Sequence, residues 1–351
     1  MSDIAAIDPN FKIETKIEQA DLRFYDVLQA PFQICGVFYE DGQFRRLPES
    51  VAEATSAGVM RLHTATAGGR VRFQTDSPYV AIHAKLPSIS RMPHFPICGS
   101  AGFDLYAACE GQAERYINTY IPPYDMEDGY EGILRFGDTK LREITINMPL
   151  YSGVSQLYIG LQEGATILPP KPYKPVKPSV YYGSSITQGG CASRPGSAYE
   201  STICRRNNID YVNLGFSGNA KGEPAIADYI AGLDMALFVY DYDFNAPTVE
   251  HLRATHEKMF QTIRKAHPHI PIVMMSRPKV YLSDAEVERR EIVRTTYQNA
   301  KDAGDENVYF ISGAELLADC GNEGTVDGVH PTDYGFASMA RVLGDLLEKL
   351  V

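Results

Sequence analysis

The first half of the chain carries short runs in which apolar and polar residues alternate. A period of two places every second side chain on the same face of a β-strand. Gly, Pro, Asp and Ser clusters separate the runs, and residues 10–168 contain no long amphipathic helical pattern. Many short, closely spaced strands are typical of a β-sandwich or a jelly roll. We expect strands at 70–75, 79–84, 102–106, 141–146 and 156–160.

After residue 178 the pattern changes to apolar strands that alternate with helical stretches. The clearest helical stretch is 248–267, in which Leu252, Met259, Phe260 and Ile263 fall on one face. Alternating strands and helices predict βαβ units and a parallel sheet. Five strands with helices on both faces give a three-layer, flavodoxin-like α/β domain. The strands are expected at 180–182, 211–214, 235–240, 271–275 and 308–311, and the helices near 197–206, 223–231, 248–267, 284–302 and 334–350.

A proline-rich stretch, 168–178, lies between the two patterns. Proline-rich segments are semi-rigid connectors, so this stretch predicts a domain boundary. We expect an all-β domain over 1–168, a linker over 169–178 and an α/β catalytic domain over 179–351. A short, stiff linker should hold the two domains in contact.

Charge and composition narrow the classes of partner. The formal net charge is -11 at pH 7 and no basic block is present, which argues against nucleic acid and against an anionic membrane surface. No apolar run approaches the ~20 residues that span a bilayer, and residues 1–9 lack the basic start of a secretory signal. The six cysteines show no metal-ligand spacing. Free thiols in a reducing compartment and a cytoplasmic location are the expectation, and the oligomeric state stays open.

Four polar features follow strands of the α/β half or precede its last helix. Ser185 lies in the turn after the first strand, and the others are the segments 213–219, 241–247 and 327–331. Ligands bind to open α/β sheets at the carboxyl ends of the strands. The features are therefore expected to meet at one edge of the sheet.

In this order the features resemble the sequence blocks of the SGNH (GDSL-type) hydrolase superfamily. The segment Gly183-Ser184-Ser185-Ile186-Thr187 is similar to the first block, usually Gly-Asp-Ser, with Ser185 in the position of the nucleophile. Ser184 stands where aspartate is common. The resemblance covers residues 179–351.

The remaining blocks supply the other site residues that the resemblance implies. Gly218 matches the glycine of the second block, and Asn245 matches the asparagine of the third. Asp327 and His330 match the Asp-x-x-His of the fifth block. The third block is usually Gly-x-Asn-Asp, and the segment 243–246 departs from that pattern.

The first half carries a resemblance of its own. Residues 102–106, Gly-Phe-Asp-Leu-Tyr, resemble the Gly-x-Asp-Leu-Tyr signature of a β-domain that precedes some bacterial SGNH esterases. The resemblance therefore implies that the two predicted domains form a known arrangement.

Elementary chemistry supports the implied roles. A serine hydroxyl is a poor nucleophile unless a base takes its proton, and His330 can take that proton and return it to the leaving group. Asp327 can hold the other ring nitrogen of His330 and stabilise the imidazolium. The backbone N–H groups of Ser185 and Gly218 and the side-chain amide of Asn245 are candidate donors to an oxyanion. This chemistry needs no metal and no cofactor.

For several of these residues a structural role remains an alternative to the functional one. Gly218 can be a turn glycine, and Asn245 can be the N-cap of the helix that starts near residue 247. Arg277, after the fourth strand, can contact substrate or can be a solvated or ion-paired arginine. Asp241 and Asp243 favour structural roles over a metal pair, since no third ligand of matching spacing appears. We interpret Ser217 as a loop residue and Cys191 as a packing residue.

The sequence therefore predicts a serine ester hydrolase that removes small acyl groups, such as acetyl, from a carbohydrate or another polar small molecule. The sugar preference comes from the resemblance. Three alternatives remain. They are a glycan-binding protein with an inactive hydrolase domain, an acyltransferase of the same fold, and a metal-dependent phosphoesterase, for which chelators should reveal a metal requirement that we do not expect.

Overall fold

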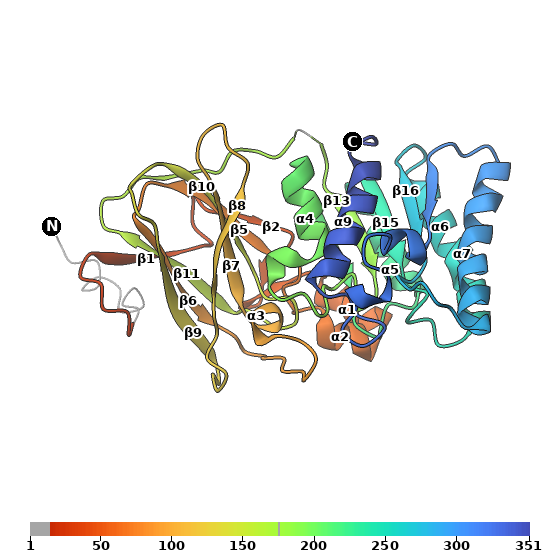
Figure 1. The fold of residues 1–351 in the computed structure, drawn as a ribbon, viewed down its shortest axis with the longest axis horizontal. Coiled ribbons are helices and arrows are strands. Elements are labelled where there is room, and N and C mark those ends of the chain that lie inside the picture. Colours follow the sequence, from red (N-terminus) through yellow and green to blue (C-terminus); the bar gives the residue numbers. More distant parts are fainter. Residues whose placement is uncertain (1–14, 175) are drawn as a thin grey trace.

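The computed structural model of the protein describes residues 15–174 and 176–351. The N-terminal segment, on which the expectation about a secretory signal depends, and residue 175 of the predicted linker lie outside the described residues. Figure 1 shows a β-sandwich beside an α/β domain. This arrangement confirms the predicted fold class.

The N-terminal half forms two antiparallel sheets that pack face to face. One sheet has the order β1 (Leu22–Asp26), β11 (Gln156–Gln162), β6 (Tyr79–Lys85) and β9 (Gly129–Arg135). The other has the order β12 (Ile167–Leu168), β5 (Arg70–Thr75), β10 (Arg142–Asn147), β7 (Phe103–Ala108) and β8 (Arg115–Tyr120), and β2 (Gln33–Cys35) also pairs with β5. β3 (Phe38–Glu40) and β4 (Gln43–Arg45) form a separate hairpin.

The alternation in the sequence explains the core of the sandwich. Val71 and Phe73 of β5 and Ile144 and Ile146 of β10 are fully buried between the sheets. They alternate with polar neighbours along each strand, as expected for strands with one face on a core.

The C-terminal half forms a parallel sheet with the order β14 (Tyr211–Gly215), β13 (Ser179–Gly183), β15 (Leu237–Asp241), β16 (Ile272–Met275) and β17 (Val308–Ile311). In chain order this is 2-1-3-4-5, the order of a flavodoxin-like sheet. Helices α5 (Pro224–Ala231), α6 (Val249–Ala266) and α7 (Asp284–Asp302) pack on one face, and α4 (Tyr199–Asn207), α8 (Gly313–Leu316) and α9 (Asp333–Leu347) pack on the other. The short elements α3 (Ile97–Ser100), η3 (Pro195–Ser197) and η4 (Gly321–Gly324) lie in connections between these strands and helices.

Two short helices cross from the N-terminal half into the core of the α/β domain. They are α1 (Glu49–Thr55) and α2 (Ala57–Leu62), drawn in orange below the α/β domain in Figure 1. Ala52 and Val59 are buried in the same hydrophobic cluster as Ile226 of α5. The boundaries 1–168, 169–178 and 179–351 therefore remain our proposal for the chain segments. Helices α1 and α2 belong to the first segment but pack on the α/β domain.

Buried polar contacts join the two halves. Asp104, the aspartate of the Gly-x-Asp-Leu-Tyr segment, is fully buried and accepts hydrogen bonds from the backbone N–H of Gly196 at 2.8 Å and from Asn147 Nδ2 at 2.7 Å. Arg46 is also buried and donates to the carbonyl oxygen of Gly215 at 2.6 Å. Since a buried polar group is costly without its partners, these contacts fix the domains against each other.

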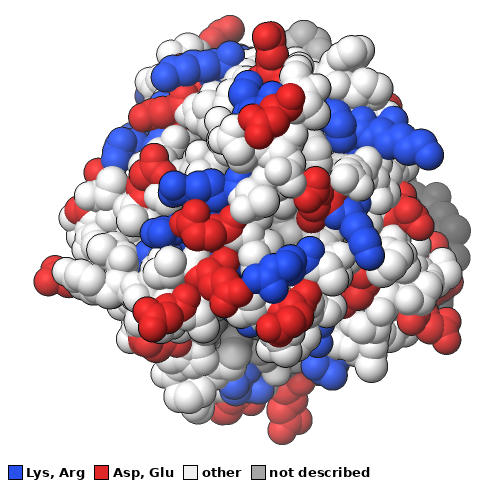
Figure 2. Space-filling view, turned by 90° about the vertical axis from the view of Figure 1, so that its right-hand side faces the viewer, with Lys and Arg blue, Asp and Glu red and all other residues white. Residues whose placement is uncertain are grey.

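The surface of the α/β domain carries charges of both signs. On the face that Figure 2 shows, basic and acidic side chains are interspersed and no large patch of one sign stands out. None of the helices in the described part of the chain combines the length and the apolar character needed to cross a membrane.

Candidate active site

The turn that carries Ser185 follows β13 directly, at the carboxyl edge of the parallel sheet. The backbone N–H of Gly190 donates to the carbonyl oxygen of Ser185 at 2.8 Å, which closes the turn. A Cβ atom at position 183 would lie 1.9 Å from Asp241 Oδ1, so glycine is required where the turn begins. The tight turn leaves the side chain of Ser185 partly exposed.

The structure brings Ser185, His330 and Asp327 together. Ser185 Oγ lies 2.9 Å from His330 Nε2, and His330 Nδ1 lies 2.8 Å from Asp327 Oδ2. If Nδ1 carries the ring proton and donates a hydrogen bond to the carboxylate, Nε2 is free to accept a hydrogen bond from the serine hydroxyl. The geometry is that of a nucleophile, a base and a group that orients the base.

The segment 325–331 holds Asp327 in its charged form. Burial alone would raise the pKa of this carboxyl, but hydrogen bonds from the backbone and the ring of His330 and from the backbone N–H of Val329 outweigh it and lower the pKa. The N–H of Val326 donates to the carbonyl oxygen of His330 at 2.8 Å. The loop is therefore closed on itself, and the side chains of Asp327 and His330 emerge from one turn.

The three predicted oxyanion donors lie in the turn of Ser185 and in the loops that follow β14 and β15. Among the residues that the structure describes, the backbone N–H groups of Ser185 and Gly218 donate to no protein acceptor. Gly218 has φ +70° and open space where a Cβ would stand. Asn245 Nδ2 donates to the carbonyl oxygen of Phe216 at 3.1 Å. This hydrogen bond joins the loop after β15 to the loop that contains Gly218.

The structure distinguishes two of the alternatives that the sequence leaves open. The N-cap of α6 is Thr248, whose side chain accepts from the N–H of His251, so Asn245 does not cap that helix. Arg277 is buried and donates to Asp243 Oδ2 at 3.3 Å and to Glu286 Oε1 at 2.9 Å. This geometry favours the ion-paired interpretation of Arg277 over a contact with substrate.

Asp241 supports the serine turn from the buried side. Its Oδ1 accepts from Thr187 Oγ1 at 2.6 Å and from the backbone N–H of Ser184 at 3.3 Å. Burial, partly opposed by the bond from Thr187, raises the pKa of this carboxyl to about 7. The structural role expected for Asp241 fits these contacts.

Sequence reasoning missed two further supports of the site. The hydroxyl of Tyr151, which comes from the β-sandwich half, donates to the carbonyl oxygen of Ser185 at 3.1 Å. Gln188 is buried, donates to the carbonyl oxygen of Leu150 and accepts from the N–H of Ser217 at 2.9 Å. No local pattern could have found these residues, because their partners lie about 30 residues or more away along the chain.

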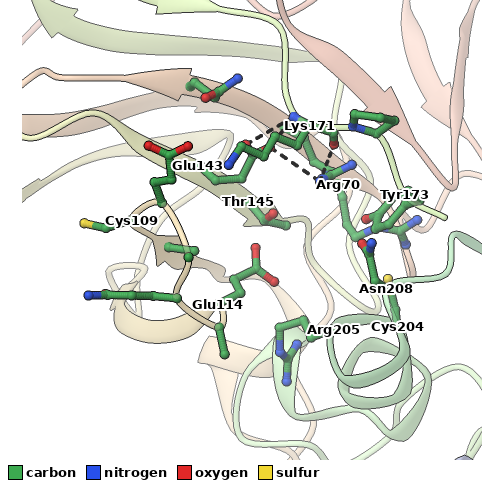
Figure 3. A pocket seen from close by; sticks show the side chains of 18 of the residues that line it. Arg70, Cys109, Glu114, Glu143, Thr145, Lys171, Tyr173, Cys204, Arg205 and Asn208 are labelled. Carbon is green, nitrogen blue, oxygen red and sulfur yellow. Dashed lines mark hydrogen bonds and ion pairs between the residues drawn. The ribbon is translucent and has the colours of Figure 1, made fainter.

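A separate cavity of about 480 Å³ lies at the junction of the two halves. Figure 3 shows side chains of β10, the linker and α4 around it, with Glu143 bonded to the backbone of Lys171. In the described part of the chain its lining includes neither Ser185 nor His330. The cavity therefore does not belong to the site built around Ser185.

The fold and the arrangement of these side chains are typical of three-layer α/β hydrolases that use a serine nucleophile. A serine at the carboxyl edge of the sheet, a histidine and a carboxylate in line, and unpaired N–H donors beside the serine make up the parts that acyl transfer needs.

The comparisons with known proteins place the chain in a family. Residues 176–348 belong to the GDSL-like lipase/acylhydrolase family. Residues 22–167 match the domain described as the N-terminus of Esterase_SGNH_hydro-type. The chain is thus an SGNH-type carboxylic ester hydrolase with its N-terminal β-domain, which confirms the resemblance noted in the sequence. No curated relative matches the chain.

Solved structures agree with this fold over nearly the whole length. A candidate GDSL-like lipase from Bacteroides ovatus is 26% identical, with a TM-score of 0.83 over 94% of this chain and 98% of that chain. The salicylyl-acyltransferase SsfX3 from a tetracycline biosynthetic pathway is 20% identical, with a TM-score of 0.75 over the same shares. A family two carbohydrate esterase from Cellvibrio japonicus is 12% identical, with a TM-score of 0.61 over 94% and 98%. The last two likenesses show the fold alone.

Proposed function

We propose that this enzyme removes short acyl groups, acetyl above all, from a carbohydrate or another polar small molecule by way of an acyl-enzyme on Ser185. The observation that carries the proposal is the continuous set of contacts from Ser185 Oγ through His330 to Asp327, at 2.9 and 2.8 Å. The side chains of His330 and Asp327 are 22% and 37% exposed, so an ester can reach them.

The first half of the proposed reaction acylates Ser185. Its Oγ attacks the ester carbonyl carbon while its proton passes to His330 Nε2. The oxyanion forms against the N–H groups of Ser185 and Gly218 and the amide of Asn245. When the C–O bond of the ester breaks, His330 gives the proton to the leaving alcohol.

Water completes the cycle. His330 takes a proton from the water as it attacks the acyl carbon, and the same proton returns to Ser185 Oγ when the acid leaves. Asp327 keeps its charge throughout and stabilises the imidazolium. No step requires a metal or a cofactor.

Support for a sugar ester comes from proteins that share the fold. The Cellvibrio japonicus carbohydrate esterase has the same overall arrangement, and so does an acetyl xylan esterase from Butyrivibrio proteoclasticus, with a TM-score of 0.57 at 13% identity. The chain has 22 tyrosines and no tryptophan. Stacking on a sugar ring would therefore use tyrosine or phenylalanine.

Acyl transfer to an acceptor other than water is a second candidate function. The acyltransferase SsfX3 shares the fold over 94% of the present chain. The two candidates share the acyl-enzyme and differ only in what attacks it. Added alcohols that accept the acyl group at the expense of free acid would favour transfer.

The experiment that tests the proposal compares wild type and Ser185→Ala on acetylated sugars and on p-nitrophenyl esters of increasing acyl length. We expect release of acetate by wild type, fastest for the shortest chains, and none above background by the variant. Equal turnover by the two proteins would show that another residue is the nucleophile. Turnover of long-chain esters alone would overturn the choice of substrate.

A further inference from the structure

Three side chains with metal-binding atoms meet beside the proposed nucleophile. They are His94, Cys191 and His330, and one ligand atom from each lies within 4.8 Å of the other two. Residues 15–174 and 176–351 contain no other group of three or more His, Cys, Asp or Glu side chains whose ligand atoms lie this close together. The proposed mechanism uses His330 and leaves the other two without a task.

His94 comes from the β-sandwich half. It lies in the turn 92–95, which the N–H of Phe95 closes by donating to the carbonyl oxygen of Met92 at 3.2 Å. Phe95 packs edge-on against Tyr151, with ring centroids 5.1 Å apart, and this contact fixes the turn over the site. The ring of His94 lies 5.5 Å from that of His330, centroid to centroid, and has no hydrogen-bond partner among the described residues.

Cys191 occupies an unusual backbone position. Its φ is +89°, a region that costs free energy for any residue other than glycine. The two residues before it, Gly189 and Gly190, are glycines. Cys191 is buried, and its thiol lies within 4.8 Å of a ring nitrogen of His330. The strained backbone therefore places a sulfur ligand atom beside His330.

We propose that His94, Cys191 and His330 bind a divalent zinc-like ion, and that the bound ion shuts off hydrolysis. Two imidazole nitrogens and one thiolate are ligands that Zn²⁺ prefers, with bonds of about 2.0–2.1 Å to nitrogen and about 2.3 Å to sulfur. Tetrahedral geometry with these bonds places the ligand atoms roughly 3.4–3.6 Å apart. The three ligand atoms now lie within 4.8 Å of one another, so ion binding requires them to move closer together.

The hydrogen bonds of His330 make binding and catalysis mutually exclusive. Asp327 holds Nδ1 at 2.8 Å, as carboxylates do for metal-bound histidines, and this leaves Nε2 as the ligand atom. The same Nε2 lies 2.9 Å from Ser185 Oγ and can serve either the ion or the serine proton. On binding, the thiol of Cys191 loses its proton to solvent, and no electron is transferred.

The donor set also predicts selectivity. Thiolate and imidazole favour Zn²⁺, Cu²⁺ and Co²⁺, whereas Mg²⁺ and Ca²⁺ prefer oxygen ligands. Chelators should therefore leave the purified enzyme active or raise its activity. The inhibitory part of this inference rests on the proposed function, whereas ion binding does not.

The test has two independent readouts on the purified full chain. Co²⁺ is titrated as a spectroscopic probe, and the thiolate-to-cobalt charge-transfer band is recorded for wild type, Cys191→Ser, His94→Gln and the control Cys109→Ser. Zn²⁺ inhibition of p-nitrophenyl acetate hydrolysis is measured on the same proteins, with reversal by EDTA. Cys109 is a free cysteine away from the cluster, so its variant tests for adventitious thiol binding.

We expect the band in wild type and in Cys109→Ser, its loss in Cys191→Ser, and a shift in His94→Gln. Loss of one outer-shell partner weakens metal binding about 10- to 100-fold, so loss of a direct ligand should raise the half-inhibitory Zn²⁺ concentration at least about tenfold. Equal inhibition of all four proteins, or a band that survives Cys191→Ser, would overturn the proposal. If wild type shows the band but hydrolyses no ester, the metal site stands and the proposed function fails.

Discussion

Ser185 has an open side and a buried side, and an aspartate acts on each in a different way. On the open side, Asp327 is 37% exposed and receives hydrogen bonds from His330 and Val329, which lower its pKa. On the buried side, Asp241 is enclosed beside Thr187, and burial raises its pKa to about 7.

The difference shows that the environment, rather than the residue type, sets the charge of each aspartate near the proposed nucleophile. A carboxylate that must stabilise an imidazolium has to be charged, and the donors around Asp327 keep it so. A carboxyl that only holds a turn can accept hydrogen bonds in either form. The open side is therefore suited to chemistry, and the buried side to positioning.

The largest effect is expected on the open side. Ser185→Ala or His330→Ala should lower kcat by about 10⁶-fold, the loss seen when either member of a comparable serine–histidine pair is removed. The melting temperature should hardly change, since both side chains are partly exposed. Steady-state kinetics and thermal unfolding check the two halves of this statement. Ser217→Ala, the nearby loop serine, is the control and should keep most of its turnover.

On the buried side, Asp241 should affect how stability depends on pH rather than the rate of catalysis. From pH 4 to pH 7 the unfolded state loses the proton of Asp241 while the folded state keeps it, so stability falls as the pH rises. A shift from 3.8 to about 7 corresponds to roughly 4 kcal/mol. Asp241→Asn cannot ionise, and its unfolding free energy relative to wild type should rise by that order between pH 4 and pH 8. Urea unfolding at both pH values measures it, and parallel curves would rule out a buried titrating group.

The proposed oxyanion donors should give an intermediate effect. Asn245→Ala should lower kcat about 100- to 1000-fold with little change in KM, because the donor acts on charge that develops only in the transition state. Single-turnover kinetics on p-nitrophenyl acetate would record the change in the acylation step. A variant that changes KM alone would show that Asn245 binds substrate instead.

The smallest effect is expected from the support supplied by the β-sandwich. Tyr151→Phe removes one hydrogen bond to the carbonyl oxygen of Ser185, which costs about 1 kcal/mol, or up to ~10-fold in kcat if the turn shifts. Tyr79→Phe removes a tyrosine hydrogen bond to the carboxylate of Asp21, within the sandwich, and serves as a control. It should lower stability at least as much, since the acceptor is charged, and leave kcat unchanged. Equal kcat values for the two variants would show that the β-sandwich does not help to position Ser185.

Much of the fold could be predicted because its signals are local. The helix 284–302 and the strands 70–75 and 308–311 have the bounds that the pattern predicted, since period and flanking residues define them. The helices α1 and α2 have seven and six residues, too few for a helical period to stand out. Their place in the α/β core depends on α5, more than 160 residues later.

The site divides in the same way. Ser185, Gly218, Asn245, Asp327 and His330 stand in short sequence blocks and could be proposed from them. Tyr151, Gln188 and Arg46 could not, because a tyrosine, a glutamine or an arginine carries no local mark of a distant partner. The ion pairs of Arg277 with Asp243 and Glu286 likewise appear only when the strands are assembled.

The most direct test of the account is to label the enzyme with a fluorophosphonate and to locate the adduct by peptide mass spectrometry. The account predicts one adduct, on Ser185, formed rapidly in wild type and Ser217→Ala and barely at all in His330→Ala. Labelling of another serine, or labelling of Ser185 at the same rate without His330, would contradict the claim that Ser185 and His330 act as nucleophile and base.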